Sequence, residues 1–269
     1  MTVYLPLKGV RVLSFELAFA LPAGTRVLSD LGAEVVRVVR PGGNPYSRYI
    51  SAVDGVFHGK PCIDIDLKTA RGKQLALDLA LEADVVSNNY RPGVLDKFGL
   101  GSDRLRKAKP ELIWMQLSGY GTPGPWSTFP AYGPSTEAAG GLNRLFVNEE
   151  EVPIRVGSGV FSDQLSGRYA ALAIVAALEK RCETGEGATI DLSMTECITH
   201  MLGSLMVQAA TTGSVPSAEG NRHSRYVPQG VYPCAGVDQW LAISIGTQQT
   251  WEQLVDIVAD ARLNNAMTI

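Results

Sequence analysis

The sequence predicts an α/β fold in which a doubly wound, mostly parallel sheet is flanked by helices. Short runs rich in β-branched residues alternate with longer segments of helical periodicity along most of the chain. This alternation is typical of parallel strands joined by crossover helices. Several of the short runs end in Asn, Ser or Gly, as strands do at the edge where a doubly wound sheet binds its ligand.

The first elements form a βαβ unit, which is the seed of a parallel sheet. Its two strands are expected at 10–15 and 34–39. Pro22 and Gly24 are expected to break the chain after the first strand, so the helix is predicted at 25–31, with Gly32 as its C-terminal glycine.

The same pattern repeats further along the chain. Strands are predicted at 62–67, 84–86, 112–117 and 188–192, and helices at 69–82, 163–181 and 193–212. On the helix at 69–82, Leu75, Leu79 and Ala83 recur at helical spacing and are expected to form the buried face. The segment 119–167 is rich in glycine and proline and is expected to be mainly loop.

The C-terminal part of the chain predicts a change of architecture. Antiparallel strands are expected at 230–232 and 240–245, and a helix at 251–259. We therefore expect a large domain over 1–198, a linker helix and connector over 199–222, and the beginning of a smaller α+β domain over 223–269.

Composition argues against several classes of protein. A formal net charge of −3 and a pI near 5.7 argue against nucleic acid as a partner. The longest apolar run, 169–178, is too short to span a bilayer, and the N-terminus shows no signal-peptide pattern, so we expect a cytoplasmic protein with no membrane partner. The four cysteines lack CxxC pairing and are expected to be reduced, buried thiols, and the three histidines lack metal-ligand spacing, so no metal is expected.

Asp163 is the main candidate for chemistry. It follows the glycine loop at Gly157 and Gly159 and stands at the start of an apolar helix. One interpretation is structural, because Asp is a common N-cap residue. In the other, the helix N-terminus keeps the carboxylate ionised as a covalent nucleophile, and the N–H groups of the glycine loop stabilise an oxyanion. The loop lacks the third glycine of a dinucleotide fingerprint.

Basic residues indicate a ligand that carries phosphate. The segment 91–111 contains six basic and three acidic residues, which form either a solvated helical face or a docking site for a phosphorylated ligand. Arg40 and Lys68 stand at the ends of predicted parallel strands, where such a ligand would bind.

Longer strings in the sequence resemble a known family. They are LKGVRVLSF (7–15), LSDLGAEVVRVVRPGG (28–43), NNYRPGVLDKFGLG (88–101), SGYGTPGP (118–125) and RVGSGVFSDQLSGRYAALAIVAALEKRCETGEG (155–187). In order and spacing these strings resemble the class III CoA-transferase family, which includes carnitine and formyl-CoA transferases and α-methylacyl-CoA racemase.

The resemblance implies a Rossmann-like large domain, a small domain, and two chains interlocked as a dimer. Coenzyme A, as substrate and carrier, would lie across the carboxyl ends of the strands, and Asp163 matches the family's catalytic aspartate. The residues that match the family's CoA contacts are Arg40, Ile65, Lys68, Asn89, Tyr90, Lys97 and Tyr132, with Phe98 nearby. Arg91 and Arg104 are added to this set because of their charge.

The implied reaction moves coenzyme A between an acyl-CoA thioester and a free carboxylic acid, through anhydride and thioester intermediates on Asp163. Two alternatives stay open. The racemase branch of the family also uses a histidine, but the matching segment 130–133 contains none. The other alternative is a non-catalytic or truncated acyl-CoA-binding subunit.

Departures from the family pattern bear on the site and on the assembly. Leu21 stands where the family's first turn has glycine, and Gly133 stands where the family usually has Asp. The glycine-rich lid of some transferases is not found in the matching stretch 223–230. Family members are substantially longer than 269 residues. We therefore expect a truncated form or half of a split enzyme, acting as a homodimer or as a heteromer with a related subunit.

Overall fold

A computed structural model describes residues 4–43, 55–148, 152–154, 161–216, 218–223 and 225–263 of the chain. The chain divides into two units, the first made of residues 1–143 and 155–215 and the second of residues 144–154 and 216–269. The first unit contains a six-stranded sheet and the second a two-stranded sheet.

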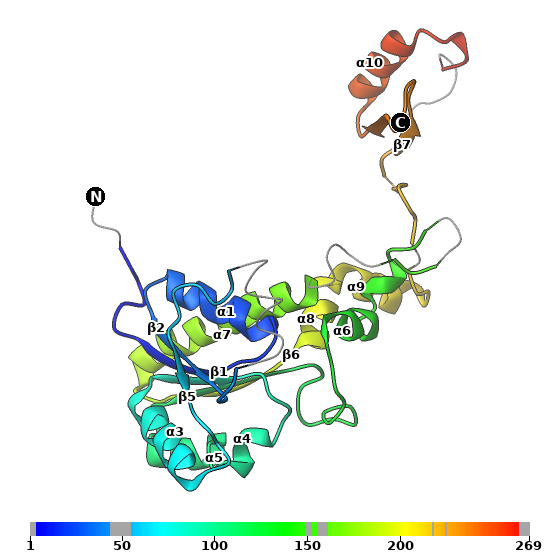
Figure 1. The fold of residues 1–269 in the computed structure, drawn as a ribbon. Helices are drawn as coiled ribbons and strands as arrows, with labels where there is room; N and C mark the ends of the chain where they lie inside the picture. The colour runs from blue at the N-terminus through cyan, green and yellow to red at the C-terminus, as the bar shows by residue number, and fades with distance from the viewer. Residues whose placement is uncertain are drawn as a thin grey trace. The chain divides into compact units, whose positions relative to one another are not determined.

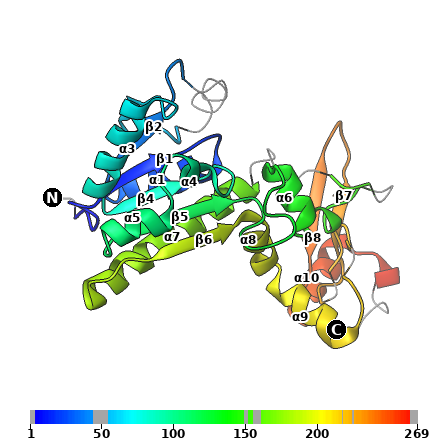
Figure 2. The same cartoon turned by 90° about the horizontal axis from the view of Figure 1, so that it is seen from below.

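The large sheet confirms the predicted parallel architecture. Its strands are β1 (Arg11–Phe15), β2 (Glu34–Val39), β3 (Cys62–Asp64), β4 (Val85–Asn88), β5 (Ile113–Ser118) and β6 (Thr189–Ser193). They lie in the order β3-β2-β1-β4-β5-β6, and every neighbouring pair is parallel (Figures 1 and 2). The strand order reverses between β1 and β4, so a ligand site is expected beyond the carboxyl ends of these two strands.

Helices cover both faces of this sheet (Figure 1). One face packs against α1 (Ala20–Asp30) and α7 (Phe161–Thr184), and the other against α3 (Ala70–Glu82), α4 (Val94–Lys97) and α5 (Ser102–Ala108). Successive strand residues supply the two cores in turn: Val85 belongs to the core under α1 and α7, and Val86 to the core under α3 and α5. Strands buried on both faces explain the continuous apolar runs in the sequence.

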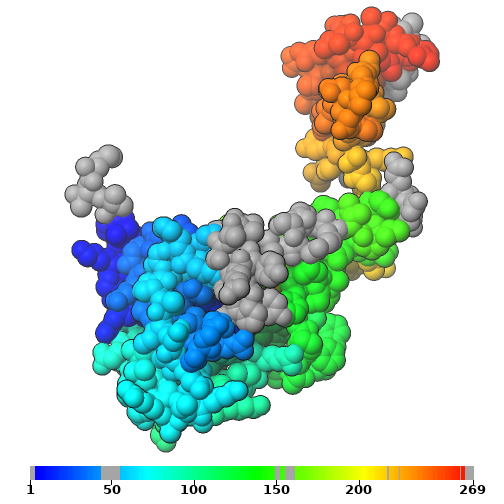
Figure 3. Space-filling view, viewed as in Figure 1, coloured from blue at the N-terminus to red at the C-terminus, as the bar shows by residue number. Residues whose placement is uncertain are grey.

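Three more helices belong to the first unit, namely α6 (Gly133–Ala139), α8 (Met194–Met201) and α9 (Gly203–Thr212). A 3-10 turn, η1 (Leu142–Arg144), follows α6. In the space-filling view, cyan segments of the first unit adjoin its green segments in the lower part of the picture (Figure 3).

Several elements differ from the prediction. α1 begins at Ala20 rather than at residue 25, because Pro22 falls in its first turn, where proline costs no hydrogen bond. α6 lies inside the segment that was expected to be mainly loop. The predicted helix at 193–212 is two helices that meet at Leu202, and β3 ends at Asp64 rather than at residue 67.

The buried face of α3 differs from the prediction only in part, because Ala83 is buried and Leu79 packs against the core as expected. Gly72, Ala76 and Ala80 are buried, whereas Leu75 is 41% exposed. A Cβ on Gly72 would lie 2.0 Å from the carbonyl oxygen of Asp66. Because small side chains allow a close approach, these three small residues are buried, while Leu77, Leu79 and Leu81 pack against the same core but are only partly buried.

The second unit confirms the predicted antiparallel pair. β7 (Gln229–Pro233) pairs with β8 (Trp240–Ser244), and α10 (Gln248–Val258) follows them. The helix begins after the N-cap Thr247, whose side chain accepts the backbone N–H of Thr250. A 3-10 turn, η2 (Ala261–Leu263), ends the described part of the chain.

Two glycines bring α1 and α7 into close contact. A Cβ on Gly24 would lie 2.4 Å from the carbonyl oxygen of Gly167, and a Cβ on Gly167 would lie 2.5 Å from the carbonyl oxygen of Ala20. Gly167 lies one helical turn after Asp163, on the same face of α7. The contact therefore places Asp163 beside the N-terminus of α1.

Replacing Gly167 by alanine should destabilise the protein by about 1–3 kcal/mol, because the added Cβ must displace the backbone of α1. The free energy of unfolding in urea measures the effect. Gly203→Ala is the matched control, since a Cβ on Gly203 meets nothing within 4 Å, and its effect should stay within about 0.5 kcal/mol. Equal effects of the two variants would contradict a tight contact between α1 and α7.

Candidate active site

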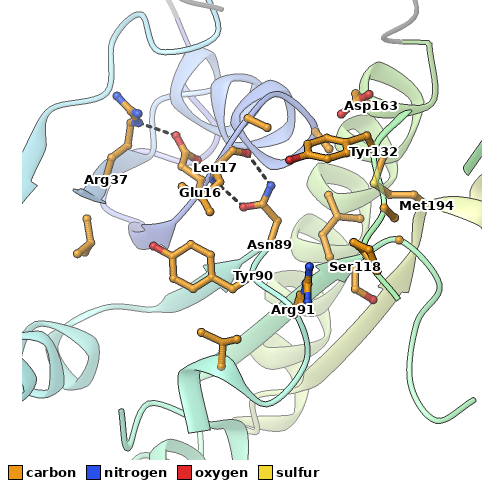
Figure 4. A pocket seen from close by; sticks show the side chains of 18 of the residues that line it. Glu16, Leu17, Arg37, Asn89, Tyr90, Arg91, Ser118, Tyr132, Asp163 and Met194 are labelled. Carbon is orange, nitrogen blue, oxygen red and sulfur yellow. Dashed lines mark hydrogen bonds and ion pairs between the residues drawn. The ribbon is translucent and has the colours of Figure 1, made fainter. Parts of the chain in front are cut away.

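A cavity of about 570 Å³ lies at the carboxyl edge of the large sheet. Residues at the ends of four strands and at the start of α7 contribute to it, namely Glu16, Val39, Asn89, Ser118 and Asp163 (Figure 4). Arginine side chains give the cavity a cationic part, and Leu117, Ala131 and Met194 give it an apolar part. It thus occupies the position where doubly wound sheets bind their ligands.

Asp163 is 9% exposed and lies in the first turn of α7. The helix begins at Phe161, so the N-cap interpretation of Asp163 is wrong. Burial raises the pKa of its carboxyl to about 6, and the neighbouring Glu137 acts in the same direction. The backbone N–H groups of Asp163 itself and of Ala20 lower this pKa. Asp163 is therefore ionised at neutral pH in an environment that disfavours its charge, as expected of a reactive carboxylate.

Hydrogen bonds tie α6 to the start of α7 around this carboxylate. Glu137 is 1% exposed and accepts the backbone N–H of Ser162 at 3.1 Å. The hydroxyl of Ser162 donates to the carbonyl of Gly133 at 3.0 Å. The hydroxyl of Thr136 lies 3.0 Å from the hydroxyl of Ser162. The bond from Glu137 satisfies an N–H group that the first helical turn leaves free, and so holds Glu137 close to Asp163.

A second group of charges is buried at the end of β1. We call it the Glu16 cluster, and it consists of Ser14, Glu16, Thr25, Arg37 and Lys60. Glu16 accepts hydrogen bonds from the side chains of Ser14 at 2.9 Å, Thr25 at 2.6 Å, Arg37 at 2.7 Å and Lys60 at 2.9 Å. The side chains of Glu16 and Lys60 are fully buried. One carboxylate thus binds two cations, of which Arg37 lines the cavity together with Glu16 (Figure 4).

The environment of the Glu16 cluster changes the ionisation of its neighbours. Burial lowers the pKa of Lys60 to about 8, although Glu16 opposes this effect. Burial also raises the pKa of Tyr90, and the charge of Glu16 adds to the increase. The guanidinium carbon of Arg37 lies 3.7 Å from the centre of the Phe57 ring, which gives this cation a second partner.

The cavity brings together six residues that the sequence had indicated, namely Arg40, Asn89, Tyr90, Arg91, Tyr132 and Asp163. Five others do not line it. Ile65 is buried in the core under α3 and α5 and Phe98 packs against that core, whereas the side chains of the other three are exposed: Lys68, Lys97 and Arg104. Gly157 and Gly159 lie outside the described residues.

The sequence interpretation missed Glu16, Arg37, Lys60 and Glu137. Glu16 had a recognisable signal, because a charged residue directly after a buried strand falls at the ligand edge of the sheet. Lys60 and Glu137 had none, because their partners are distant in the sequence. Lys60 contacts Glu16 across 44 positions, and Glu137 contacts Ser162 across 25.

Within the described ranges, no group of three or more His, Cys, Asp and Glu side chains could hold a metal ion. None of the helices described is both long and apolar enough to cross a membrane. All four cysteines are free, but only Cys197 is buried. The expectation of buried thiols is therefore wrong for Cys62, Cys182 and Cys234, which lie at the surface.

Comparison with known proteins assigns the family. The sequence model of CoA-transferase family III matches residues 7–268. The chain belongs to CoA-transferase family III. This assignment confirms the resemblance that the sequence strings indicated, and the cavity lies on the part of the family fold that the resemblance associates with coenzyme A.

Relatives in CoA-transferase family III are about 30% identical to this chain. A probable CoA-transferase of Mycobacterium tuberculosis is 31% identical over 97% of the chain, and the acetyl-CoA:oxalate CoA-transferase of Acetobacter aceti is 32% identical over 96%. The succinyl-CoA–D-citramalate CoA-transferase of Chloroflexus aurantiacus is 31% identical over 96%. The chain spans 34%, 68% and 66% of the lengths of these three proteins.

Solved structures of family III proteins share the fold. The crystal structure of a CAIB/BAIF family protein from Brucella suis superposes with a TM-score of 0.86 at 29% identity, covering 96% of this chain and 72% of that one. A Mycobacterium tuberculosis protein, Rv3272, superposes with a TM-score of 0.84 at 30% identity, covering 97% and 70%. This chain therefore corresponds to roughly two thirds of these family members.

Proposed function

We propose that this chain is the nucleophile-bearing, CoA-binding part of a CoA-transferase that moves coenzyme A between an acyl-CoA and a free carboxylic acid. The Asp163 carboxylate carries the proposal. It is buried at the cavity, the backbone N–H of Ala20 lowers its pKa, and no ion pair among the described residues involves it. A carboxylate that no cation neutralises keeps its nucleophilicity.

In the proposed first half-reaction, coenzyme A moves from the acyl group of the donor to Asp163. A carboxylate oxygen of Asp163 attacks the thioester carbonyl, the C–S bond breaks, and CoA thiolate leaves a mixed anhydride behind. The thiolate then attacks the aspartyl carbonyl, and the C–O bond to the donor acyl group breaks. The donor leaves as a carboxylate, Asp163 becomes a CoA thioester, and no net proton transfer is required.

The second half-reaction reverses these steps with the acceptor. An acceptor carboxylate attacks the aspartyl thioester and releases thiolate, which then attacks the acceptor's acyl carbon in the new anhydride. The products are acceptor acyl-CoA and the free Asp163 carboxylate. Each tetrahedral stage needs oxyanion donors, and we propose the loop N–H groups at Gly157 and Gly159 for this role.

We propose that the nucleotide end of coenzyme A binds at the cationic side of the cavity. Guanidinium groups match phosphate geometry well, and Arg40 and Arg91 line this side. The resemblance to the family adds four residues outside the cavity to the proposed CoA path, namely Ile65, Lys68, Lys97 and Phe98, and Arg104 is added because of its charge. Tyr132 would lie near the thioester. Binding energy from the remote nucleotide then positions the thioester against Asp163.

The names of the relatives suggest where to look for substrates and assembly. Relatives act on oxalate, citramalate and glutarate. Two others are the alpha and beta subunits of a succinyl-CoA–L-malate CoA-transferase of Chloroflexus aurantiacus. We propose that this chain acts on carboxylic acids as a homodimer or together with a related subunit.

Mass spectrometry of the intact protein tests the covalent intermediate. The protein is incubated with acetyl-CoA, succinyl-CoA or a 2-methylacyl-CoA, each with and without a free acid, and is then treated with hydroxylamine. We expect a hydroxamate at Asp163, located by peptide mapping, and no such product in Asp163→Ala. Binding of acyl-CoA without any adduct or transfer would indicate a non-catalytic subunit and contradict the proposal.

The same samples in deuterated water distinguish a racemase from a transferase. A transferase needs an acceptor acid and leaves the α-hydrogen of the 2-methylacyl-CoA in place. Rapid deuterium incorporation at the α-carbon without an acceptor would overturn the proposed reaction in favour of proton exchange.

A further inference from the structure

The turn between β1 and α1 approaches Asp163 and has an unusual backbone conformation. Ala18 lies in this turn with φ of +53°, a region that non-glycine residues occupy only when their surroundings impose it. Leu17, Ala18 and Ala20 all line the cavity. Something must therefore hold this turn against relaxation.

Asn89 holds one side of the turn. Its side-chain oxygen accepts the backbone N–H of Leu17 at 2.7 Å, and its side-chain nitrogen donates to the backbone carbonyl of Leu17 at 2.7 Å (Figure 4). Asn89 directly follows β4, the strand that pairs with β1. Both polar atoms of the Asn89 side chain are thus committed to the protein backbone.

The Glu16 cluster holds the other side of the turn. Glu16 precedes the turn and binds the hydroxyl of Thr25 in α1 at 2.6 Å. Lys60 donates to the carbonyl of Pro22, in the first turn of α1, at 2.9 Å. These bonds hold the end of β1 and the start of α1 on the two sides of the turn. Within the turn, the N–H and the carbonyl of Leu17 are bound by Asn89.

The turn leads directly to a donor for Asp163. The backbone N–H of Ala20, the first residue of α1, is one of the groups that lower the pKa of Asp163, and both residues line the cavity. The close contact of Gly24 with Gly167 keeps the start of α1 beside this part of α7. Only two residues separate Leu17 from Ala20, so a displacement of Leu17 would move the N–H of Ala20 relative to the Asp163 carboxylate.

We propose that Asn89 is a positioning residue, whose amide clamps Leu17 and thereby fixes the turn that presents the Ala20 N–H to Asp163. Asp163 as the nucleophile rests on the proposed function, but the clamp itself does not. The resemblance to the family implies that Asn89 contacts coenzyme A. The clamp gives the Asn89 side chain a different role, because its amide oxygen and one N–H of its amide nitrogen are already bonded to the backbone of Leu17.

The groups that face Asp163 define what the clamp controls. Glu137 approaches from α6 and disfavours the carboxylate charge, whereas the N–H of Ala20 from α1 and the N–H of Asp163 itself favour it. If the N–H of Ala20 moves away, the pKa of Asp163 should rise, because one of the groups that lower it is lost. A direct titration of Asp163 therefore reports on the clamp, whether or not the reaction is assayed.

Asn89→Leu removes both hydrogen bonds and preserves the side-chain volume. NMR titration of protein labelled with ¹³C at the aspartate carboxyls follows Asp163, which is assigned by its loss in Asp163→Asn. We expect the pKa of Asp163 to rise by about half to one unit. We also expect the kcat of transfer to fall about ten- to hundredfold with an unchanged KM for acyl-CoA. Asn89→Ala serves if the leucine variant does not fold.

Ser29→Ala is the matched control. It removes the bond from the Ser29 hydroxyl to the carbonyl of Gly59 at 3.0 Å, at the opposite end of α1 from the turn. We expect it to leave the pKa of Asp163 and kcat unchanged. An unchanged Asp163 pKa in both Asn89 variants, or a higher KM with kcat preserved, would overturn the proposal. A raised Asp163 pKa in a protein that transfers no CoA would support the clamp and refute the proposed reaction.

Discussion

Asp163→Asn should abolish CoA transfer and at the same time make the protein more stable at neutral pH. The amide cannot form the anhydride, so transfer should fall by about a thousandfold or more. The gain in stability has a separate cause. The fold buries the Asp163 carboxylate beside Glu137, with no cation to pair it among the residues described. Asparagine has the same shape and no charge to bury.

The pH dependence of this gain follows from the raised pKa. The carboxyl has a pKa of about 6 in the folded protein and about 3.8 in the unfolded chain. Between these values the folded state binds the proton more tightly, so the stability of the wild type falls as pH rises toward 6. The full penalty, about 3 kcal/mol at most, is present above pH 6. Below pH 3.8 the residue is protonated in both the folded and the unfolded wild type, and the higher stability of Asp163→Asn disappears.

Thermal unfolding at pH 4 and pH 7.5, together with transfer assays, measures both effects. We expect a higher Tm for Asp163→Asn at pH 7.5, corresponding to about 1–3 kcal/mol, and nearly equal values of Tm at the lower pH. A variant that is less stable than the wild type at both pH values would contradict the account of Asp163 as a strained, buried charge. Retained transfer would exclude it as the nucleophile.

Glu16→Ala should destabilise the protein by about 3–5 kcal/mol, because it leaves Lys60 and Arg37 side by side without their common anion. The side chain of Lys60 is fully buried, and that of Arg37 is 11% exposed, so bulk water solvates these two cations poorly. Lys60 keeps only neutral partners, namely the carbonyl of Pro22 at 2.9 Å, the hydroxyl of Thr25 at 2.7 Å and the ring of Phe57, whose centre lies 5.6 Å from its Nζ.

This loss should shrink as pH rises. Burial already lowers the pKa of Lys60 to about 8 while Glu16 raises it, so removal of Glu16 lowers the pKa further. The folded variant then releases the Lys60 proton at a lower pH than the wild type does, whereas the unfolded chain keeps the proton up to about 10.5. Between these limits the unfolded state binds more protons, so the variant gains stability with increasing pH. Urea unfolding at pH 6 and pH 9 measures the difference.

Glu82→Ala is the matched control for Glu16→Ala. It breaks the ion pair of Glu82 with Arg11 at 3.3 Å, whose side chains are 75% and 52% exposed. We expect a cost below about 1 kcal/mol, because an exposed pair gains little in water. Equal costs for the two variants would show that the Glu16 cluster contributes no more than a surface ion pair.

The sequence by itself was sufficient for the six strands of the large sheet in their order along the chain and for the candidate nucleophile. The strands of a sheet covered on both faces are continuous apolar runs, and α7 has Asp163 at the start of a long apolar segment. These signals are local, because each lies within one element. The family assignment followed from the same kind of signal, namely strings of adjacent residues such as 88–101.

Only the tertiary structure decided how Asp163 is surrounded. Pro22 and Gly24 were interpreted as helix breakers, but Pro22 fits the first turn of α1 and Gly24 allows the contact with Gly167. The roles of Glu16 and Asn89 depend on partners that lie on other strands and loops, as Lys60 does for Glu16 and Leu17 for Asn89. A charged or amide side chain in a sequence shows which bonds it can form, but only packing brings its partner within reach and removes the water that would compete for it.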